Sequence, residues 1–249
     1  MINRTGIDII EHQNNKLIKK LGLFIKKNFP ETTRKYLKTD TKDFRNIIVI
    51  AQDKLNKLDI VKKTVSAIKD ELFITLQTDK ILVQSIAHLR ATRPSINNTG
   101  EFIQLHRESF FGLGMEKCFN VWTPIKGVSE NNSLNYVPYS HRIPLKDIKL
   151  KRKDSHFTKQ YSAGHKIGLL YKDMIITKGV DTKKKKPLIV SSGSSAVFEC
   201  NLIHGSALNN SNDIRFSYDF RIIKKSDYKK KYFKSKNFAS NSEYFIELE

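Results

Sequence analysis

AVFECNLIHGSALNNSNDIRFSYDFRII, residues 196–223, is the stretch that decides the fold of this 249-residue chain. It contains two β-prone runs, 196–203 and 214–223, separated by a segment rich in Asn and Ser. Short runs of this kind between turn-forming residues are typical of antiparallel β-structure. We therefore expect both runs to be strands.

The same texture extends toward the N-terminus as far as the turn-like residues 97–100. Four further runs are strand candidates: 102–106, 118–123, 133–137 and 188–190. In residues 149–186 charged side chains dominate, and there we expect a mobile loop or lid.

The first third of the chain has helical periodicity instead. Apolar residues recur at helical spacing over residues 9–29, where Pro30 ends the run, and again over residues 42–90. A basic amphipathic helix can lie on a membrane or bind a partner, but packing on its own domain is commoner. Helices followed by many short strands predict an α+β protein, an antiparallel barrel or sandwich with helices on one face.

Charge and cysteine content restrict the partners and the compartment. Lys and Arg outnumber Asp and Glu by 45 to 25, a net charge of +20 that favours anionic partners. The basic residues are spread along the chain, which favours a solvated lysine surface over a dedicated polyanion site. Two cysteines are too few for a disulfide framework, and no uninterrupted apolar stretch approaches a signal peptide or membrane span. We expect a cytoplasmic protein without a membrane partner.

Candidate metal ligands begin with His106-Arg107-Glu108. An iron ion that must also bind oxygen and a co-substrate needs few protein ligands, a need met by two histidines and one carboxylate. On a strand, His106 and Glu108 would point to one side and Arg107 to the other. With seven histidines and 25 acidic residues in the chain, one such triplet is no surprise by itself.

The second half of the pattern is HGS, residues 204–206, followed by Arg215 and Arg221. Together with QLHRESFFG, residues 104–112, it resembles the phytanoyl-CoA dioxygenase-like branch of the 2-oxoglutarate oxygenases. Two intervening segments also match in order: VWTP (121–124) resembles the family's V-W-x-P strand, and NSL to VPYSH (132–141) its turn. The resemblance covers residues 100–222 and looks closest to oxygenases found with carbohydrate and aminoglycoside biosynthesis genes.

The resemblance implies a fold and a set of roles. The fold is a double-stranded β-helix (jelly-roll or cupin-like) core with N-terminal helices on one face. In one domain, 1–249, residues 1–95 would be mainly helical, 96–225 the core with the iron site, and 226–249 a C-terminal tail. The co-substrates would be 2-oxoglutarate and O2. Residues with implied or candidate roles are the Fe(II) ligands His106, Glu108 and His204, and the co-substrate contacts Arg215, Ser217, Ser206, Trp122 and Gln104.

Two residues depart from the family pattern. Glu108 replaces the commoner Asp, so the metal position or the backbone must adjust for one extra methylene. Tyr139 stands where the family usually has Gly, which leaves the conformation of that turn open. Relatives that halogenate lack the carboxylate, so Glu108 argues against halogenation.

The sequence leaves several hypotheses open about the roles of these residues and about the function. Taken singly, His106 could be a buried strand histidine and Arg215 with Asp219 a structural ion pair. As an enzyme, the chain would hydroxylate or desaturate a small polar metabolite, such as a sugar or a phosphorylated or nucleotide-linked one. Steeply salt-dependent binding would favour nucleic acid or another macromolecule as substrate. Failure to bind Fe(II) would favour a non-catalytic binding module.

Overall fold

A large antiparallel sheet forms the centre of the molecule in a computed structural model that describes residues 2–14, 16–95, 101–112, 114–155, 158–170, 172–233 and 243–248. Over these residues it has seven strands in the order β1-β9-β4-β11-β2-β12, and β3 also pairs with β11. The strands are β1 (Ile7–Glu11), β2 (Ile81–Gln84), β3 (His88–Thr92), β4 (Cys118–Pro124), β9 (Ser194–Glu199), β11 (Arg215–Lys224) and β12 (Phe245–Glu247).

Two smaller antiparallel sheets complete the β-structure of the described residues. One has the order β10-β5-β8 and the other pairs β6 with β7. Their bounds are β5 (Leu134–Tyr136), β6 (Lys149–Asp154), β7 (Lys172–Lys178), β8 (Lys186–Leu188) and β10 (His204–Ser206). The strands predicted at 118–123, 133–137 and 214–223 are thus confirmed as β4, β5 and β11.

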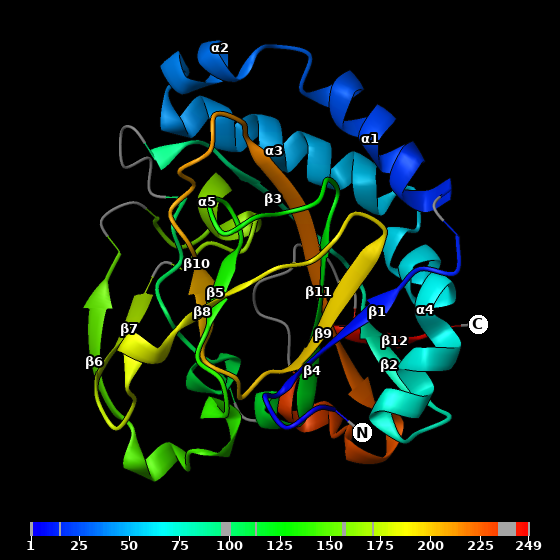
Figure 1. Ribbon diagram of the computed structural model, residues 1–249, viewed down its shortest axis with the longest axis vertical. Coiled ribbons are helices and arrows are strands. Elements are labelled where there is room, and N and C mark those ends of the chain that lie inside the picture. The colour runs from blue at the N-terminus through cyan, green and yellow to red at the C-terminus, as the bar shows by residue number, and fades with distance from the viewer. Residues whose placement is uncertain are drawn as a thin grey trace.

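The helices pack on one face of the large sheet (Figure 1). They are α1 (Lys16–Asn28), α2 (Thr33–Lys38), α3 (Thr41–Asn56) and α4 (Ile60–Leu76), and the short α5 (Ala163–Lys166) lies elsewhere in the chain. On β11 every second residue, Tyr218, Phe220 and Ile222, is fully buried in the core that these helices share with the sheet. The alternate residues of β11 therefore face away from the helices.

The N-terminal part contains more strand than its periodicity predicts. The helix expected over residues 9–29 is wrong at its start, because β1 pairs with β9 and buries Ile7 and Ile10. The side chain of Asn14 accepts a hydrogen bond from the backbone N–H of Lys16 (3.1 Å), next to the start of α1. Tertiary pairing here overrides a helical pattern whose apolar spacing also fits a short strand.

The helix expected to continue through residue 90 is also wrong at its end. Helix α4 stops at Gln77, which has a left-handed φ of 53°. Strands β2 and β3 follow, and all four residues of β2 are buried between β11 and β12. A fully buried strand has no alternation of polar and apolar residues, so its sequence cannot be told from a buried helix segment. Strand β12 also shows that the predicted C-terminal tail joins the sheet.

Other predicted boundaries change as well. Residues 102–106 form no strand, and their one β-bridge joins His106 to His204. The strands expected at 188–190 and 196–203 are shifted toward the N-terminus, as β8 and β9. Part of the loop expected at 149–186 is strand instead: β6 pairs with β7, and Leu150 lies opposite Ile176. Both of these side chains pack against a small buried apolar cluster. The turn predicted at 97–100 lies outside the described residues.

Among the residues described, no helix is both long and apolar enough to cross a membrane.

Candidate functional site

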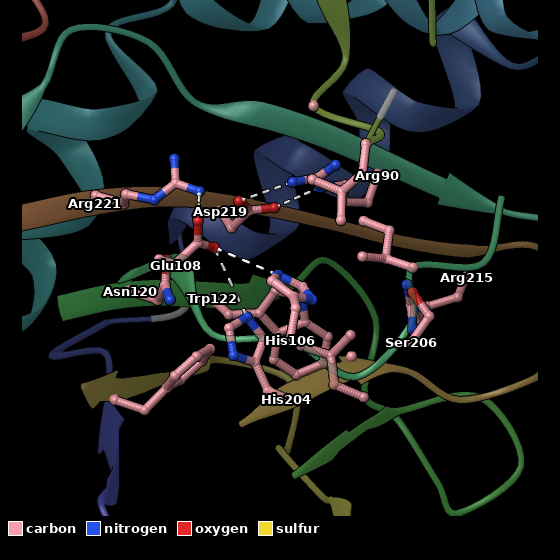
Figure 2. A pocket seen from close by; sticks show the side chains of 16 residues that line it. Arg90, His106, Glu108, Asn120, Trp122, His204, Ser206, Arg215, Asp219 and Arg221 are labelled. Atoms are coloured by element: carbon pink, nitrogen blue, oxygen red, sulfur yellow. Dashed lines mark hydrogen bonds and ion pairs between the residues drawn. The ribbon is translucent and has the colours of Figure 1, made fainter. Parts of the chain in front are cut away.

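Two histidines from distant parts of the chain are held side by side by backbone pairing. The N–H of His106 donates to the carbonyl oxygen of His204 (2.8 Å), and the N–H of His204 donates to the carbonyl of His106 (2.9 Å). Their ring centroids lie 4.6 Å apart, and both side chains are buried. Figure 2 shows both rings turned toward the carboxylate of Glu108.

Each histidine is oriented by a carbonyl two residues earlier. Nδ1 of His106 lies 2.7 Å from the carbonyl oxygen of Gln104, and Nδ1 of His204 lies 2.9 Å from that of Leu202. A carbonyl only accepts, so Nδ1 carries the proton and, in a neutral ring, Nε2 carries a free lone pair. The two Nε2 atoms lie 3.7 and 3.9 Å from Oε1 of Glu108.

The protonation states of His204 and Glu108 also suit a cation. Burial, and the nearby His106, lower the pKa of His204 to about 4, so its ring is neutral at pH 7. Burial alone would raise the pKa of Glu108, but Arg221 and the two histidines hold it well below its usual value. The three ligand atoms lie within 4.8 Å of one another. Two imidazole nitrogens and a carboxylate oxygen at this spacing fit a divalent metal such as iron.

From the sequence we expected His106 and Glu108 to converge because they alternate along a strand. The structure brings them together in another way. His106 occupies an isolated bridge, and Glu108 begins a 3₁₀ helix, Glu108–Phe110. The N–H of Glu108 donates to the carbonyl of Cys200 (2.9 Å), which fixes this turn beside the β9 end. Arg107 does point away, and its guanidinium donates to the carbonyl of Ile143 (2.9 Å).

A pocket beside the three residues is lined from both the large sheet and the β10-β5-β8 sheet. Its lining includes His106, Glu108, His204, Trp122, Asn120, Leu134, Ser206, Arg215, Asp219 and Arg221. Arg215, Asp219 and Arg221 occupy the face of β11 opposite its apolar residues. Figure 2 shows Arg215 and Ser206 on the other side of the pocket from Arg221.

Arg215 is buried and positioned by backbone and side-chain acceptors. Its Nη1 donates to the carbonyl of Ser133 (2.9 Å), and its Nη2 donates to the hydroxyl of Thr92 (2.8 Å). Its buried Nε has no partner among the described residues. Burial lowers the pKa of Arg215 to about 10, so the guanidinium stays charged at pH 7. The predicted 132–134 turn thus supports a buried cation that retains donor capacity.

Asp219 does not pair with Arg215, so the structural ion pair considered from the sequence is absent. It accepts two hydrogen bonds from Arg90 of β3, from Nε at 2.6 Å and Nη2 at 3.2 Å. Nη2 of Arg221 lies 2.5 Å from Oε2 of Glu108, a contact that was not expected from the sequence. Strand alternation from Arg215 could have placed Asp219 and Arg221 in the site, whereas no sequence signal points to Arg90.

The other predicted residues divide into two groups. Trp122 and Ser206 are buried and line the pocket, and the Arg215 guanidinium carbon lies 6.0 Å from the Trp122 ring centroid. The side chain of Gln104 is exposed and outside the lining, so this residue reaches the site only through its carbonyl. Ser217 is buried, and its hydroxyl has no partner among the described residues.

The unusual Tyr139 adopts the backbone conformation that glycine favours. Its φ is 65°, in the left-handed region. The residue is 53% exposed, so this turn accommodates an aromatic side chain at its surface.

Comparison with known proteins gives a family match and several structures of similar fold. The phytanoyl-CoA dioxygenase (PhyH) family model matches residues 14–217. No curated protein sequence matches the chain at a significant level.

Three solved structures are similar over 89% of this chain. The apo form of ThoJ, described as a non-heme monooxygenase, has a TM-score of 0.54 at 14% identity over 75% of its own chain. EvdO2 from Micromonospora carbonacea var. aurantiaca has a TM-score of 0.53 at 13% identity over 87%. SnoK, a non-heme alpha-ketoglutarate-dependent carbocyclase from nogalamycin biosynthesis, has 0.52 at 12% over 80%. At these identities the likeness concerns the fold.

Proposed function

The chain belongs to the phytanoyl-CoA dioxygenase family of non-haem iron, 2-oxoglutarate-dependent oxygenases, and from this premise we propose that it hydroxylates a small polar metabolite such as a sugar or a phosphorylated or nucleotide-linked sugar. The observation that carries the proposal is one pocket that joins a His-Glu-His cluster to a buried, charged arginine. The first can hold the metal, and the second can bind the carboxylate of the co-substrate.

In this proposal His106, Glu108 and His204 hold Fe(II) through two Nε2 atoms and Oε1. Three protein ligands leave positions on the metal for co-substrate and oxygen. When bound, Fe(II) would supply the redox chemistry by which O2 oxidatively decarboxylates 2-oxoglutarate to succinate and CO2 and hydroxylates a substrate C–H bond. The chain's own residues keep the imidazole of His204 neutral and the carboxylate of Glu108 charged. Backbone pairing and the carbonyl contacts at Nδ1 hold both histidine rings in place before any ligand binds.

Arg215 would bind the distal carboxylate of 2-oxoglutarate. A guanidinium donates along several directions in one plane, and a buried one interacts more strongly with an anion than an exposed one. Trp122 and Ser206 line the same pocket as Arg215 and would contact the co-substrate. Ser217, buried on the same face of β11, would add a hydroxyl if the strand shifts slightly on binding.

The fold itself is proposed to be a double-stranded β-helix. Support comes from two observations. The strands of the large sheet and of the β10-β5-β8 sheet pair in antiparallel fashion, and residues from these two sheets line one pocket. An experimental structure that traces eight strands through two facing sheets would test this assignment.

The proposed substrate class follows from the remaining pocket wall. Arg90 and Asp219 offer charged hydrogen-bonding groups, while Ile103, Leu134 and Leu170 offer apolar contacts. A mixture of few polar groups and apolar surface suits a small ligand with several hydroxyls or a charged group. The net charge of +20 would draw an anionic metabolite toward the protein.

Succinate formation tests the reaction. Purified protein would be incubated with Fe(II), ascorbate and 2-oxoglutarate, alone and with a panel of sugars, sugar phosphates and nucleotide sugars. We expect slow substrate-independent turnover, stimulated by one class of the panel. His106→Ala should abolish turnover, and Arg215→Ala should raise the KM for 2-oxoglutarate about 100-fold, as expected for losing a buried charge-assisted contact.

Arg152→Ala is the matched control for charge, because Arg152 lies exposed on β6. It should keep wild-type turnover and KM. Stimulation only by oligonucleotides, with a steep dependence on salt, would replace the metabolite with nucleic acid. Folded wild-type protein that binds neither Fe(II) nor 2-oxoglutarate would refute the proposal altogether.

A further inference from the structure

The two carboxylate oxygens of Glu108 have different partners. Oε1 lies 3.7 and 3.9 Å from Nε2 of His106 and His204. Oε2 lies 2.5 Å from Nη2 of Arg221 and points away from the imidazoles (Figure 2). Only one oxygen is therefore directed to the position that a metal would share with both histidines.

Arg221 is itself held by two residues that do not line the pocket. Its Nη1 donates to the hydroxyl of Tyr244 (2.9 Å) and approaches Oε1 of Gln84 (3.4 Å). The backbone N–H of Arg221 donates to the same Gln84 oxygen (3.1 Å). The guanidinium side chain is 13% exposed, so water screens its contact with Glu108 little.

Tyr244 connects this arginine to the C-terminal strand. It immediately precedes β12, which pairs with β2, where Phe245 lies opposite Gln84. The carbonyl of Tyr244 accepts from the N–H of Ser85 (3.0 Å), and its ring stacks on Phe233 with centroids 6.0 Å apart. The Tyr244 hydroxyl is thus fixed by β-pairing and by an aromatic cluster.

We propose that Arg221 and Tyr244 are positioning residues that make Glu108 a one-oxygen metal ligand, so that the C-terminal segment 243–248 sets the metal affinity of the site. The inference rests on the proposed function, because it takes His106, Glu108 and His204 as the metal ligands. A carboxylate bound through both oxygens uses one more position around a metal than one bound through a single oxygen. By occupying Oε2, Arg221 keeps that position open.

The same arrangement accounts for glutamate in place of aspartate. Glu108 must reach Arg221 with one oxygen and the two imidazoles with the other, starting from the first residue of a 3₁₀ helix. The extra methylene provides that reach. An aspartate on this backbone would fall short of one of its two partners.

Metal binding without turnover provides the test. The probes are Fe(II) under anaerobic conditions, for the dissociation constant by calorimetry, and Co(II), for its visible absorption spectrum. Arg221→Met should weaken Fe(II) binding 10- to 100-fold, the usual effect of removing a partner of a metal ligand, and should change the Co(II) spectrum. Arg221→Lys should recover part of both properties.

Tyr244→Phe separates the C-terminal contribution, because it removes one hydroxyl and keeps the ring. We expect a loss of affinity of about threefold to tenfold in the wild-type background and none in the Arg221→Met background, since Tyr244 acts through Arg221. Tyr228→Phe is the matched control: Tyr228 stacks on Phe233 in the same cluster (5.6 Å between centroids). It should retain wild-type affinity and spectrum.

Each other outcome overturns the inference. Wild-type affinity in folded Arg221→Met, an unchanged Co(II) spectrum, or an equal loss in Tyr228→Phe would show that Arg221 does not position Glu108 or that Tyr244 acts only through packing. An additive effect of Tyr244→Phe in the Arg221→Met background would show that it does not act through Arg221. If wild-type protein binds no Fe(II) at all, the proposed function fails first, and that result is distinct from a failure confined to the variants.

Discussion

The two faces of β11 share one backbone but carry opposite kinds of side chain. On one face Tyr218, Phe220 and Ile222 are fully buried against the helices. On the other, Arg215, Ser217, Asp219 and Arg221 are buried or nearly so, beside the candidate metal site. Burying apolar side chains stabilises a fold, whereas burying charges costs free energy that their partners offset only in part.

The comparison indicates that the two faces of one strand have different functions. The apolar face supplies stability and keeps β11 rigid. The polar face can then hold charged groups in one geometry, although those groups add little net stability of their own. Catalytic sites are commonly built in this way, on rigid elements whose other side belongs to the core.

The largest effect should come from the apolar face. Phe220→Ala removes a fully buried ring and should lower the free energy of unfolding by about 3–5 kcal/mol, from lost burial and the cavity that remains. Fe(II) affinity of the folded fraction should stay within about twofold of wild type, because no ligand changes. Urea unfolding and calorimetry would measure the two quantities. A large loss of metal affinity with unchanged stability would contradict the assignment of stability to the apolar face of β11 and of metal binding to its polar face.

An intermediate effect is expected for Asp219→Asn, which removes the charge that pairs with Arg90. Both side chains are 13–15% exposed, and the loss should be about 1–3 kcal/mol in urea unfolding. Asp213→Asn is the control, because Asp213 faces Lys126 at 3.9 Å in an exposed pair and should cost at most about 0.5 kcal/mol. Equal losses would mean that burial of the Arg90–Asp219 pair has no energetic consequence.

The same variant should change the acid sensitivity of the protein. Burial alone would raise the pKa of Asp219, but Arg90 lowers it below its ordinary value of 3.8. A carboxyl with a lowered pKa in the folded state contributes stability that is complete above its unfolded pKa and is lost as pH falls through the folded value. Asp219→Asn should therefore flatten the loss of stability below pH 3.8, measured by urea unfolding across that range.

The smallest effect should come from Ser217→Ala. Its hydroxyl is buried without a partner among the described residues, so removing it should change the free energy of unfolding by less than about 1 kcal/mol, with either sign. If the hydroxyl contacts 2-oxoglutarate, the KM for that co-substrate should rise about threefold, the effect of losing a hydrogen bond with a net contribution of about 0.7 kcal/mol. Steady-state succinate assays would measure it. An unchanged KM would confine the role of Ser217 to packing.

Residue identity and spacing within single strands were readable from the sequence. The β-prone run 214–223 predicts β11. Alternation along it could also have placed Arg215, Asp219 and Arg221 on one face, because side-chain direction along a strand depends only on the local backbone. The ordered motifs from His106 to Arg215 also predict the family, which the match over residues 14–217 confirms. These signals are local or depend on order along the chain.

Pairing between distant segments was decided only by the tertiary structure. Strand β1 and the buried β2 could not be predicted from periodicity, since their partners β9, β11 and β12 lie far away in sequence. Glu108 meets the two histidines through a 3₁₀ turn and the His106–His204 bridge, and not through the strand its spacing suggests. Arg90 and Tyr244 also lie near the site because strands that are distant in sequence pair with one another. A side chain's chemistry is written in the sequence, but its neighbours depend on how the whole core packs.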